Sequence, residues 1–388
     1  MNQIKVIQWY EFTGVLGGSL WILTVNLLVF EMMKRKNRAS FIIFFTVAFA
    51  PIVISLIQFH AVEDEGKPVN VVILQPNIDP FTEKFDEISE KEQLTILRQL
   101  TISQIDSSAE FVIAPETTIP LIWEDNISDH PVIHFFKGII QEFPDLKLII
   151  GANTRAKITS GVSERLVRLD SITGELYIPF NSAILIDSSK NTGIYHKSVL
   201  VPGVEKMPYE RYLPFVQKFI LNLGGFSGSL EKGQGPAVFD SGNICVASVI
   251  CYESLFGYYI SRQVNKGAGL IFVITNDGWW KDTPGYRMHL AFSKLRAIET
   301  RRYVARSANT GVSAIIDSRG IIVNQTNWWE RTTLKGKMKI NEKLTFYVRN
   351  GDYIGLFAVI LILIITLILL IKNFQKRFMA RYNKKAFS

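Results

Sequence analysis

Three long stretches of the chain carry no charged side chain and consist mainly of apolar residues: 12–30, 40–59 and 353–371. Each has about the 20 residues that a helix needs to cross a hydrocarbon core roughly 30 Å thick. We therefore predict two transmembrane helices near the N-terminus and one near the C-terminus. A signal peptide fits the N-terminus poorly, because its apolar run is long and a second run follows.

Residues 69–350 follow a different pattern, in which short apolar, β-branched runs alternate with polar, helix-like stretches. Continuous apolar runs of this kind are typical of strands buried on both faces. The clearest helices are predicted at 87–107 and 289–306. The predicted strands are 70–75, 110–114, 147–151, 182–187, 244–251, 270–275 and 313–317. The alternation predicts an α/β domain whose sheets are covered by helices.

The charge distribution orients the predicted membrane helices. The chain has 43 basic and 35 acidic residues, for a formal net charge of +8. Ten of the basic residues lie in two places, the loop at 34–38 and the tail at 372–388, and the remainder is close to neutral. Basic flanks of this kind indicate cytoplasmic ends of membrane helices, and a nucleic-acid-binding face would show a different distribution. We expect residues 60–350 to lie on the opposite side, which in a bacterium is the periplasm or the outer surface.

Composition also excludes several kinds of site. Two cysteines in 388 residues exclude a disulfide framework and a cysteine-rich zinc site. The five histidines lack metal-ligand spacing, so we expect no metal and no other cofactor. The glycine-rich stretch 221–235 is not followed by the strand-loop-helix pattern of a phosphate loop, and we predict a mobile loop near the site.

Candidate chemical groups recur where predicted strands end. Glu116 follows one strand in FVIAPETTIP, Cys251 ends another in NICVASVICYES, and Asn276 follows a third in GLIFVITND. Lys197 lies in the loop-like stretch YHKSVLVPGVEKMP. Sites in α/β sheets gather at strand ends, which favours a functional interpretation. Taken singly, each residue also has an ordinary explanation as a cap, a buried thiol or a surface lysine.

The motifs are more specific in combination. They are APETTIP, HKSVLVPGVEKMP, CYESLFG, NDGWW and RAIETRRYVARSANTGVSAIIDSRG, in this order. Together they resemble the apolipoprotein N-acyltransferases, the membrane-bound branch of the nitrilase, or carbon-nitrogen hydrolase, superfamily. QWYEFTGVLGGSLWILTVN is similar to the membrane helices that precede the catalytic domain in that family. The resemblance implies a nitrilase-like αββα sandwich at residues 69–350, in the bacterial inner membrane and facing the periplasm.

The same resemblance implies a reaction and its participants. A phospholipid donates an acyl chain to form a thioester on Cys251, and the chain then passes to the N-terminal diacylglyceryl-cysteine of a lipoprotein precursor. Glu116 would be the general acid and base, while Lys197 and the Tyr252 backbone N–H would stabilise the oxyanion. Glu205 would orient Lys197. Glu253 would shape the surroundings of the nucleophile or the amine site.

Other residues match the family less specifically. Phe85 stands where the family often has Trp, in a loop over the active site. Asn276, Trp279 and Trp280 are candidate substrate contacts, and the two tryptophans could equally line an acyl pocket, anchor a loop at the lipid surface or pack in the core. In the segment 295–311, the charged side chains Arg296, Glu299, Arg302 and Arg306 have helical spacing, which predicts ion pairs along a supporting helix that ends near residue 309.

Two alternatives remain open at this stage. The first is a membrane-tethered amide hydrolase of the same superfamily, in which water would resolve the acyl-enzyme. The second is an inactive fragment or scaffold, because the family has further transmembrane helices before the segment at which this chain begins. A separate chain carrying those helices would be a partner.

Overall fold

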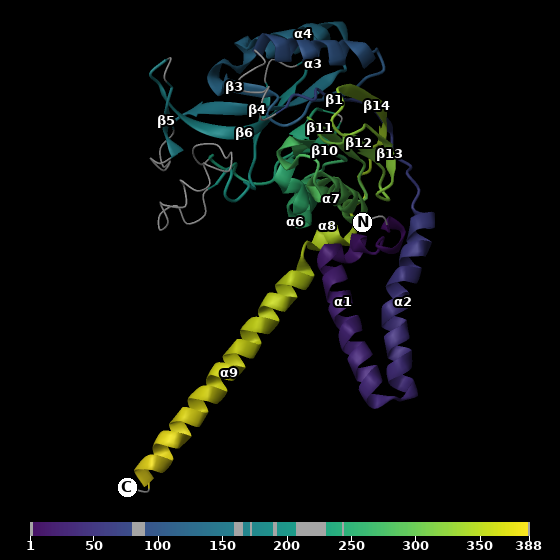
Figure 1. Ribbon diagram of the computed structural model, residues 1–388, viewed down its shortest axis with the longest axis vertical. Coiled ribbons are helices and arrows are strands. Elements are labelled where there is room, and N and C mark those ends of the chain that lie inside the picture. Colours follow the sequence, from purple (N-terminus) through teal and green to yellow (C-terminus); the bar gives the residue numbers. More distant parts are fainter. Residues whose placement is uncertain are drawn as a thin grey trace.

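A computed structural model describes residues 3–79, 90–158, 166–170, 173–188, 192–206, 230–242 and 244–386. Phe85 and most of the glycine-rich stretch 221–235 lie outside these described residues. Figure 1 shows a layered domain with three long helices that extend from one side of it.

The first sheet is built largely from the N-terminal half of the domain. The order across it is β14 (Thr332–Lys339), β1 (Pro68–Gln75), β2 (Phe111–Ile113), β4 (Lys147–Lys157), β6 (Leu176–Ile186) and β5 (Arg168–Leu169), with β3 (Ile119–Trp123) beside β4 and β7 (Gly193–His196) beside β6. The strands β1, β2 and β4 run parallel, while β6 and β14 pair antiparallel with their neighbours β4 and β1.

The second sheet comes from the C-terminal half. Its order is β13 (Ile322–Gln325), β12 (Ala314–Ile316), β11 (Val304–Ala308), β10 (Leu270–Thr275), β9 (Cys245–Ile250) and β8 (Phe239–Asp240). The three central strands β9, β10 and β11 run parallel, so that their carboxyl ends lie along one edge. The residues that follow these strands therefore come close together in space.

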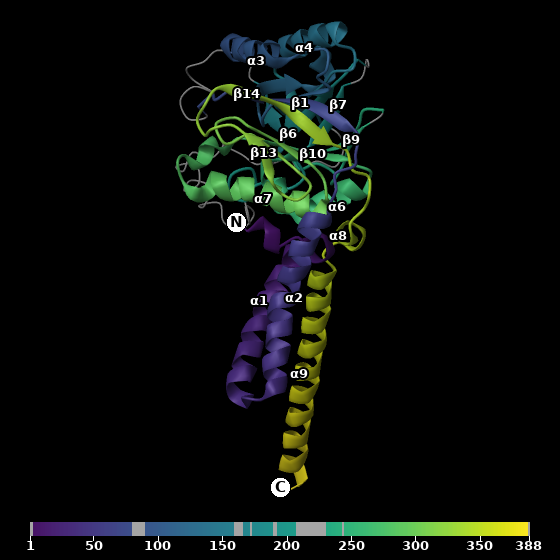
Figure 2. The ribbon, with the colours of Figure 1, turned by 90° about the vertical axis from the view of Figure 1, so that its right-hand side faces the viewer.

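The two sheets pack face to face, and helices cover both outer faces (Figures 1 and 2). The helices α3 (Glu90–Gln104) and α4 (Pro131–Glu142) pack on the first sheet, and α6 (Gly257–Asn265) and α7 (Pro284–Thr300) pack on the second. This αββα sandwich confirms the predicted fold class.

The layering explains why the predicted strands read as continuous apolar runs. In β10, Phe272 and Ile274 pack between the sheets, whereas Ile271 and Val273 pack against the helices of the second outer layer. Both faces of the strand are thus removed from water, and no polar alternation remains. The Phe272 ring meets Phe111 of the facing sheet in an edge-to-face contact with centroids 5.1 Å apart.

The predicted helix at 289–306 is wrong at both ends. The helix α7 spans Pro284–Thr300, and the chain then turns at Arg301, whose φ is 53°, before β11 begins at Val304. Pairing of β11 with strands on both sides overrides the helical spacing of the arginines. Of the predicted ion pairs, Arg296 does contact Glu299 at 3.1 Å, but Arg306 lies in a strand and pairs with a different acid.

Three helices of the described chain are long and apolar enough to cross a membrane. They are α1 (Tyr10–Arg35), α2 (Arg38–Ala61) and the first 24 residues of α9 (Tyr353–Ala386). Figures 1 and 2 show that all three leave the domain on the side that carries α6, α7 and the short α8 (Phe346–Asn350). If they cross a membrane, this side of the domain faces it.

Helix α1 is tied to the domain through polar contacts at its start. Its helical geometry breaks at Gly14, where φ is 60°, and the freed N–H of Val15 donates to Glu299 Oε1 at 3.1 Å. A side chain at Gly14 would collide with the Tyr347 ring, since its Cβ would lie 2.4 Å away. Arg301 donates to Glu11 Oε2 at 2.5 Å. The start of α1 is therefore held in a defined position on the domain.

Candidate active site

Cys251 stands at a sharp turn at the carboxyl end of β9. The strand ends at Ile250, one residue before the predicted end, and Cys251 begins the short 3₁₀-helix η5 (Cys251–Leu255). Its φ of 48° lies in the left-handed region, which non-glycine residues occupy rarely and mainly where the surroundings enforce it. The residue as a whole is half-buried, and its thiol hydrogen-bonds with Thr275 of β10.

Glu116 lies just after β2, in the first sheet. The residue is buried, with 5% of its surface exposed. One carboxylate oxygen, Oε1, accepts from Lys197 Nζ at 3.0 Å and from Asn181 Nδ2 at 2.8 Å. The other, Oε2, accepts from the backbone N–H of Asn276 at 3.1 Å. Because Asn276 follows β10, Glu116 bridges the two sheets.

Lys197 follows β7 and is 1% exposed. Its ammonium group lies between Glu116 and Glu205, with Nζ 2.8 Å from Glu205 Oε1. Burial alone would lower the pKa of Lys197, but the two carboxylates outweigh it and raise the pKa well above its ordinary value. Glu205 is itself held by the backbone N–H of Val201, which donates to its second oxygen at 2.8 Å. The lysine is therefore a permanently charged, fixed cation.

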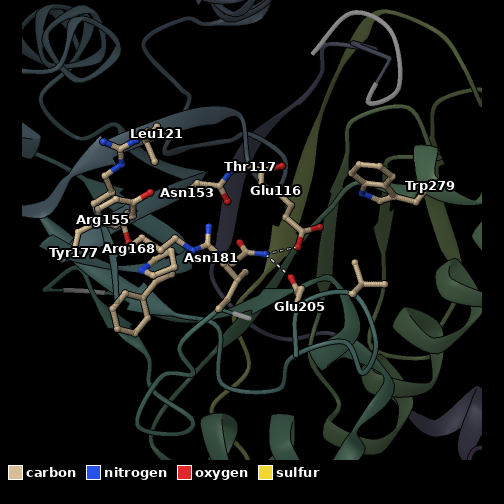
Figure 3. Close-up of a pocket in the computed structure, with 15 residues that line it drawn as sticks. Glu116, Thr117, Leu121, Asn153, Arg155, Arg168, Tyr177, Asn181, Glu205 and Trp279 are labelled. Atoms are coloured by element: carbon tan, nitrogen blue, oxygen red, sulfur yellow. Dashed lines mark hydrogen bonds between the residues drawn. The ribbon is translucent and has the colours of Figure 1, made fainter. Parts of the chain in front are cut away.

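Asn181 of β6 completes this cluster. Its Nδ2 donates to Glu116 Oε1 at 2.8 Å and to Glu205 Oε1 at 2.9 Å, as Figure 3 shows. Sequence reasoning missed this residue because the predicted strand began at residue 182, whereas β6 begins at Leu176. An asparagine inside an otherwise apolar strand was the available signal.

Glu253 lies under the site, fully buried, and links its two loops. Its Oε1 accepts from the Ser198 N–H at 2.7 Å and from the Tyr195 hydroxyl at 2.8 Å, and its Oε2 accepts from the Ile250 N–H at 2.9 Å. One carboxylate thus joins the segment after Lys197 to the strand end before Cys251. Burial raises the pKa of Glu253 to about 7, against the lowering effect of these hydrogen bonds.

The charges around Cys251 set the state of its thiol. Burial raises the pKa of Cys251 and the nearby Glu116 raises it further, while Lys197 and the Thr275 hydrogen bond lower it. The net direction is upward, so the resting group is the neutral thiol. A thiol in this state needs a base to take its proton when it attacks, and Glu116 is the neighbouring group with that capacity.

A cavity of about 270 Å³ opens beside the cluster. Glu116, Asn181 and Glu205 line one side of it, and Trp279 stands on the opposite side from Arg155 in Figure 3. Most of the remaining wall is apolar, formed by Leu121, Tyr177, Pro179, Phe180, Val204 and Leu230. The cavity can therefore accept an apolar group next to the buried ion pairs.

The other sequence-predicted residues take different places. Asn276 contributes its backbone N–H to Glu116, and its side chain caps the 3₁₀-helix η6 (Asp277–Trp280). Trp279 lines the cavity, whereas Trp280 packs edge-on against His289 with centroids 5.2 Å apart. The Tyr252 ring contacts Phe256. Within the described ranges, no group of three or more His, Cys, Asp or Glu side chains is arranged to hold a metal ion.

Comparison with known proteins places this chain in a family. Residues 65–342 match the family model described as carbon-nitrogen hydrolase. An apolipoprotein N-acyltransferase of Chlorobaculum tepidum is 30% identical over 91% of this chain and 68% of its own length. Those of Geobacter metallireducens and Thermotoga maritima are 28% and 29% identical, over 90% and 92% of this chain.

The chain belongs to the carbon-nitrogen hydrolase family, among its apolipoprotein N-acyltransferases. It spans 64% and 62% of the length of the Geobacter and Thermotoga relatives.

The solved structures that resemble this chain are more distant in sequence. An amidase from Nesterenkonia sp. is 14% identical, with a TM-score of 0.47, and covers 75% of this chain and 95% of its own. A nitrilase-superfamily member from Saccharomyces cerevisiae is 15% identical, with a TM-score of 0.47, and covers 72% and 93%.

Proposed function

We propose that this chain N-acylates the N-terminal diacylglyceryl-cysteine of bacterial lipoproteins, with a phospholipid as acyl donor and Cys251 as the acyl carrier. The proposal rests on one observation above the others: the buried ion-pair cluster of Glu116, Lys197 and Glu205 lies beside a neutral thiol. The relatives' name supports the acceptor and the group transferred, since it gives an apolipoprotein and an N-acyl group. The phospholipid donor and the thioester are part of our proposal.

In the first step, Glu116 takes the proton from the Cys251 thiol as the sulfur attacks the ester carbonyl of the phospholipid. A C–S bond forms, and the carbonyl π electrons move to oxygen. The charge of Lys197 and the backbone N–H of Tyr252 stabilise this oxyanion. The carbonyl re-forms as the C–O bond breaks, and Glu116 returns the proton to the departing lysophospholipid oxygen.

In the second step, the lipoprotein α-amine attacks the thioester carbonyl of the acyl-enzyme. Glu116 accepts a proton from the amine nitrogen, an amide forms, and the C–S bond breaks. The leaving sulfur takes the proton from Glu116, which restores the Cys251 thiol and the carboxylate. The same base thus serves both steps, and the fixed cation Lys197 serves both oxyanions.

The membrane arrangement follows from the same proposal. Helices α1, α2 and α9 cross the inner membrane, with the basic loop at 34–38 and the basic tail in the cytoplasm and the sandwich in the periplasm. A phosphatase reporter fused after Asn350 tests this orientation, because that enzyme is active only outside the cytoplasm. An inactive phosphatase fusion, together with an active fusion to a reporter enzyme that works only in the cytoplasm, would overturn this orientation.

The reaction itself is tested by intact mass spectrometry. The detergent-purified chain is incubated with bilayers of phosphatidylethanolamine and phosphatidylglycerol, with Cys251→Ala as the control. We expect a mass gain of one acyl chain that hydroxylamine removes and that the variant lacks. Addition of a diacylglyceryl-cysteine peptide should then transfer the chain to a hydroxylamine-resistant amide. No adduct on folded protein would refute the donor step, and release of free fatty acid in place of the amide would indicate a hydrolase.

A further inference from the structure

A second buried network lies behind the nucleophile and takes no part in the steps above. Its centre is His289 of α7, which is 2% exposed. The ring nitrogen Nε2 lies 3.0 Å from the backbone oxygen of Cys251 and 2.7 Å from Ser254 Oγ. The other nitrogen, Nδ1, lies 2.9 Å from Asp277 Oδ1. His289, one of the five histidines without metal-ligand spacing, thus contacts the main chain of the nucleophile itself.

The groups around the His289 ring show which of its nitrogens donates a hydrogen bond. The Cys251 carbonyl oxygen can only accept, and Ser254 Oγ donates to it at 2.7 Å, which leaves Oγ free to accept from Nε2–H. Asp277 is ionised, because Arg306 and His289 lower its pKa to about 2 although burial alone would raise it. Nε2 faces the carbonyl oxygen and therefore donates, while Nδ1 lies between Asp277 Oδ1 at 2.9 Å and Arg306 Nη2 at 3.2 Å.

His289 is fixed from the second sheet. Asp277 opens η6, after β10, and accepts from Arg306 Nη2 of β11 at 2.5 Å and from Thr275 Oγ1 at 3.1 Å. These contacts link strands β10 and β11, through the Asp277 carboxylate and the His289 imidazole, to the Cys251 carbonyl oxygen. None of these groups lines the cavity beside Glu116.

The carbonyl they hold belongs to the same planar peptide unit as the N–H of Tyr252. In a trans peptide the C=O and the N–H point in opposite directions. Two donors on the Cys251 oxygen therefore aim the Tyr252 N–H away from them, and they also polarise the unit so that this N–H becomes a stronger donor. As the second residue of a helical turn, Tyr252 has no acceptor for this N–H within the helix.

We propose that His289, held by Asp277 and Arg306, is a positioning residue that anchors the Cys251 carbonyl and so aims the Tyr252 N–H at the oxyanion. The inference rests on the proposed function only for the identity of the natural substrate, since any ester that acylates Cys251 needs the same oxyanion donor. The unusual φ of 48° at Cys251 is enforced by the same contacts.

A matched pair of variants separates this role from simple packing. An amide at the end of Gln reaches the position of His Nε2, whereas that of Asn reaches only the position of Nδ1. His289→Asn keeps a polar group beside Asp277 and loses the donor to Cys251, while His289→Gln does the reverse. We expect His289→Asn to slow acylation of Cys251 by p-nitrophenyl butyrate about 100-fold, the usual effect of losing one oxyanion donor, and His289→Gln to slow it about tenfold or less.

Alkylation of Cys251 by iodoacetamide is the second readout, followed by peptide mass to exclude Cys245. This displacement of iodide at a saturated carbon forms no oxyanion, so its rate should stay within about threefold of the wild type in both variants. Gln263→Met is the control, because the buried side chain of Gln263 also donates to two backbone carbonyls, of Ala237 and Ser248, but does not touch the Cys251 turn. It should leave both rates unchanged.

Three results would overturn the inference. They are an equal loss of acylation in the Asn and Gln variants, a parallel loss of alkylation, or wild-type acylation in His289→Asn. If His289→Asn does not fold, Ser254→Ala replaces it, with an expected loss of about tenfold in acylation alone; no loss would again contradict the inference. Because the ester probe needs no lipid, failure to react with phospholipid would count against the proposed function and leave this test intact.

Discussion

Asn181 and Lys197 donate to the same two carboxylate oxygens, Oε1 of Glu116 and Oε1 of Glu205. The asparagine is therefore a neutral counterpart of the lysine, and together they hold two acids at a fixed separation inside the protein. Two carboxylates that share only one cation in a buried site would repel each other more strongly, so the second donor stabilises the arrangement.

Replacement of Asn181 should therefore affect chemistry more than folding. We expect Asn181→Ala to slow acylation of Cys251 by about 10- to 100-fold, because Glu116 loses the donor that orients it. Asn181→Asp should be more severe, because it adds a third carboxylate beside the first two. The measurement is single-turnover acylation by p-nitrophenyl butyrate. Equal rates in the wild type and Asn181→Ala would contradict a positioning role for the asparagine.

Lys197→Met should both destabilise the protein and abolish acylation. Removal of a buried cation leaves its acids uncompensated, at a typical cost of about 3–5 kcal/mol. Addition of Glu205→Gln to this variant should recover part of the unfolding free energy, because one uncompensated charge is removed. It should recover no activity, because the oxyanion still lacks its cation. Recovered activity in the double variant would exclude Lys197 as an oxyanion donor.

Glu253→Gln tests the link between the two loops. Each oxygen of the carboxylate accepts from backbone N–H groups, and an amide can accept through only one of its two atoms. We expect acylation to fall about 10- to 100-fold. The wild-type rate should rise with pH near 7 as the carboxyl, whose pKa is raised to about 7, ionises. The variant should lack this rise. Identical pH–rate profiles in the variant and the wild type would contradict the assignment of the rise to Glu253.

Trp279→Ala tests the cavity as the acyl site. Loss of an apolar wall should weaken binding of long acyl chains, with a higher KM for phospholipid donors. The rate with the short butyryl ester should change little. Trp329→Ala is the matched control, because Trp329 is as exposed as Trp279 but does not line the cavity. A KM effect independent of chain length would place the acyl chain elsewhere.

The buried carboxyl of Glu299, which accepts from the Val15 N–H of α1, should make the stability of the protein depend on pH. Burial raises its pKa to about 7 from an ordinary value of 4.5, against the lowering effect of Arg296 and the Val15 N–H. A raised pKa in the folded state gives stability that is fully present below the unfolded value and is lost as the pH rises through about 7. The unfolding midpoint should therefore fall between about pH 5 and about pH 8.

Glu299→Gln should remove part of this slope, roughly 2 kcal/mol of it. Glu253, whose pKa is shifted in the same direction, should supply the remainder. The measurement is thermal unfolding of the detergent-purified chain at both pH values. An unchanged slope in the variant would show that Glu299 is ionised at the same pH in both states.

Much of the fold was predictable because its signals are local. The strand predicted at 270–275 is confirmed as β10 without a change of bounds, since an uninterrupted β-branched run buried on both faces has few alternatives. The run at 304–308 was missed, because arginines with helical spacing before it and within it favoured a continued helix. Only pairing with distant strands decides such a segment.

The sequence by itself determined the apolar helices, the α/β pattern and the polar groups that follow strand ends, because each depends on neighbouring residues and their periodicity. It also identified Glu116, Lys197 and Cys251 as candidates. The tertiary structure alone decided which groups hold them. Asn181 lies 65 residues from Glu116, and His289 lies 38 residues from Cys251. A hydrogen bond across such a distance depends on the packing of two sheets, and no local pattern encodes it.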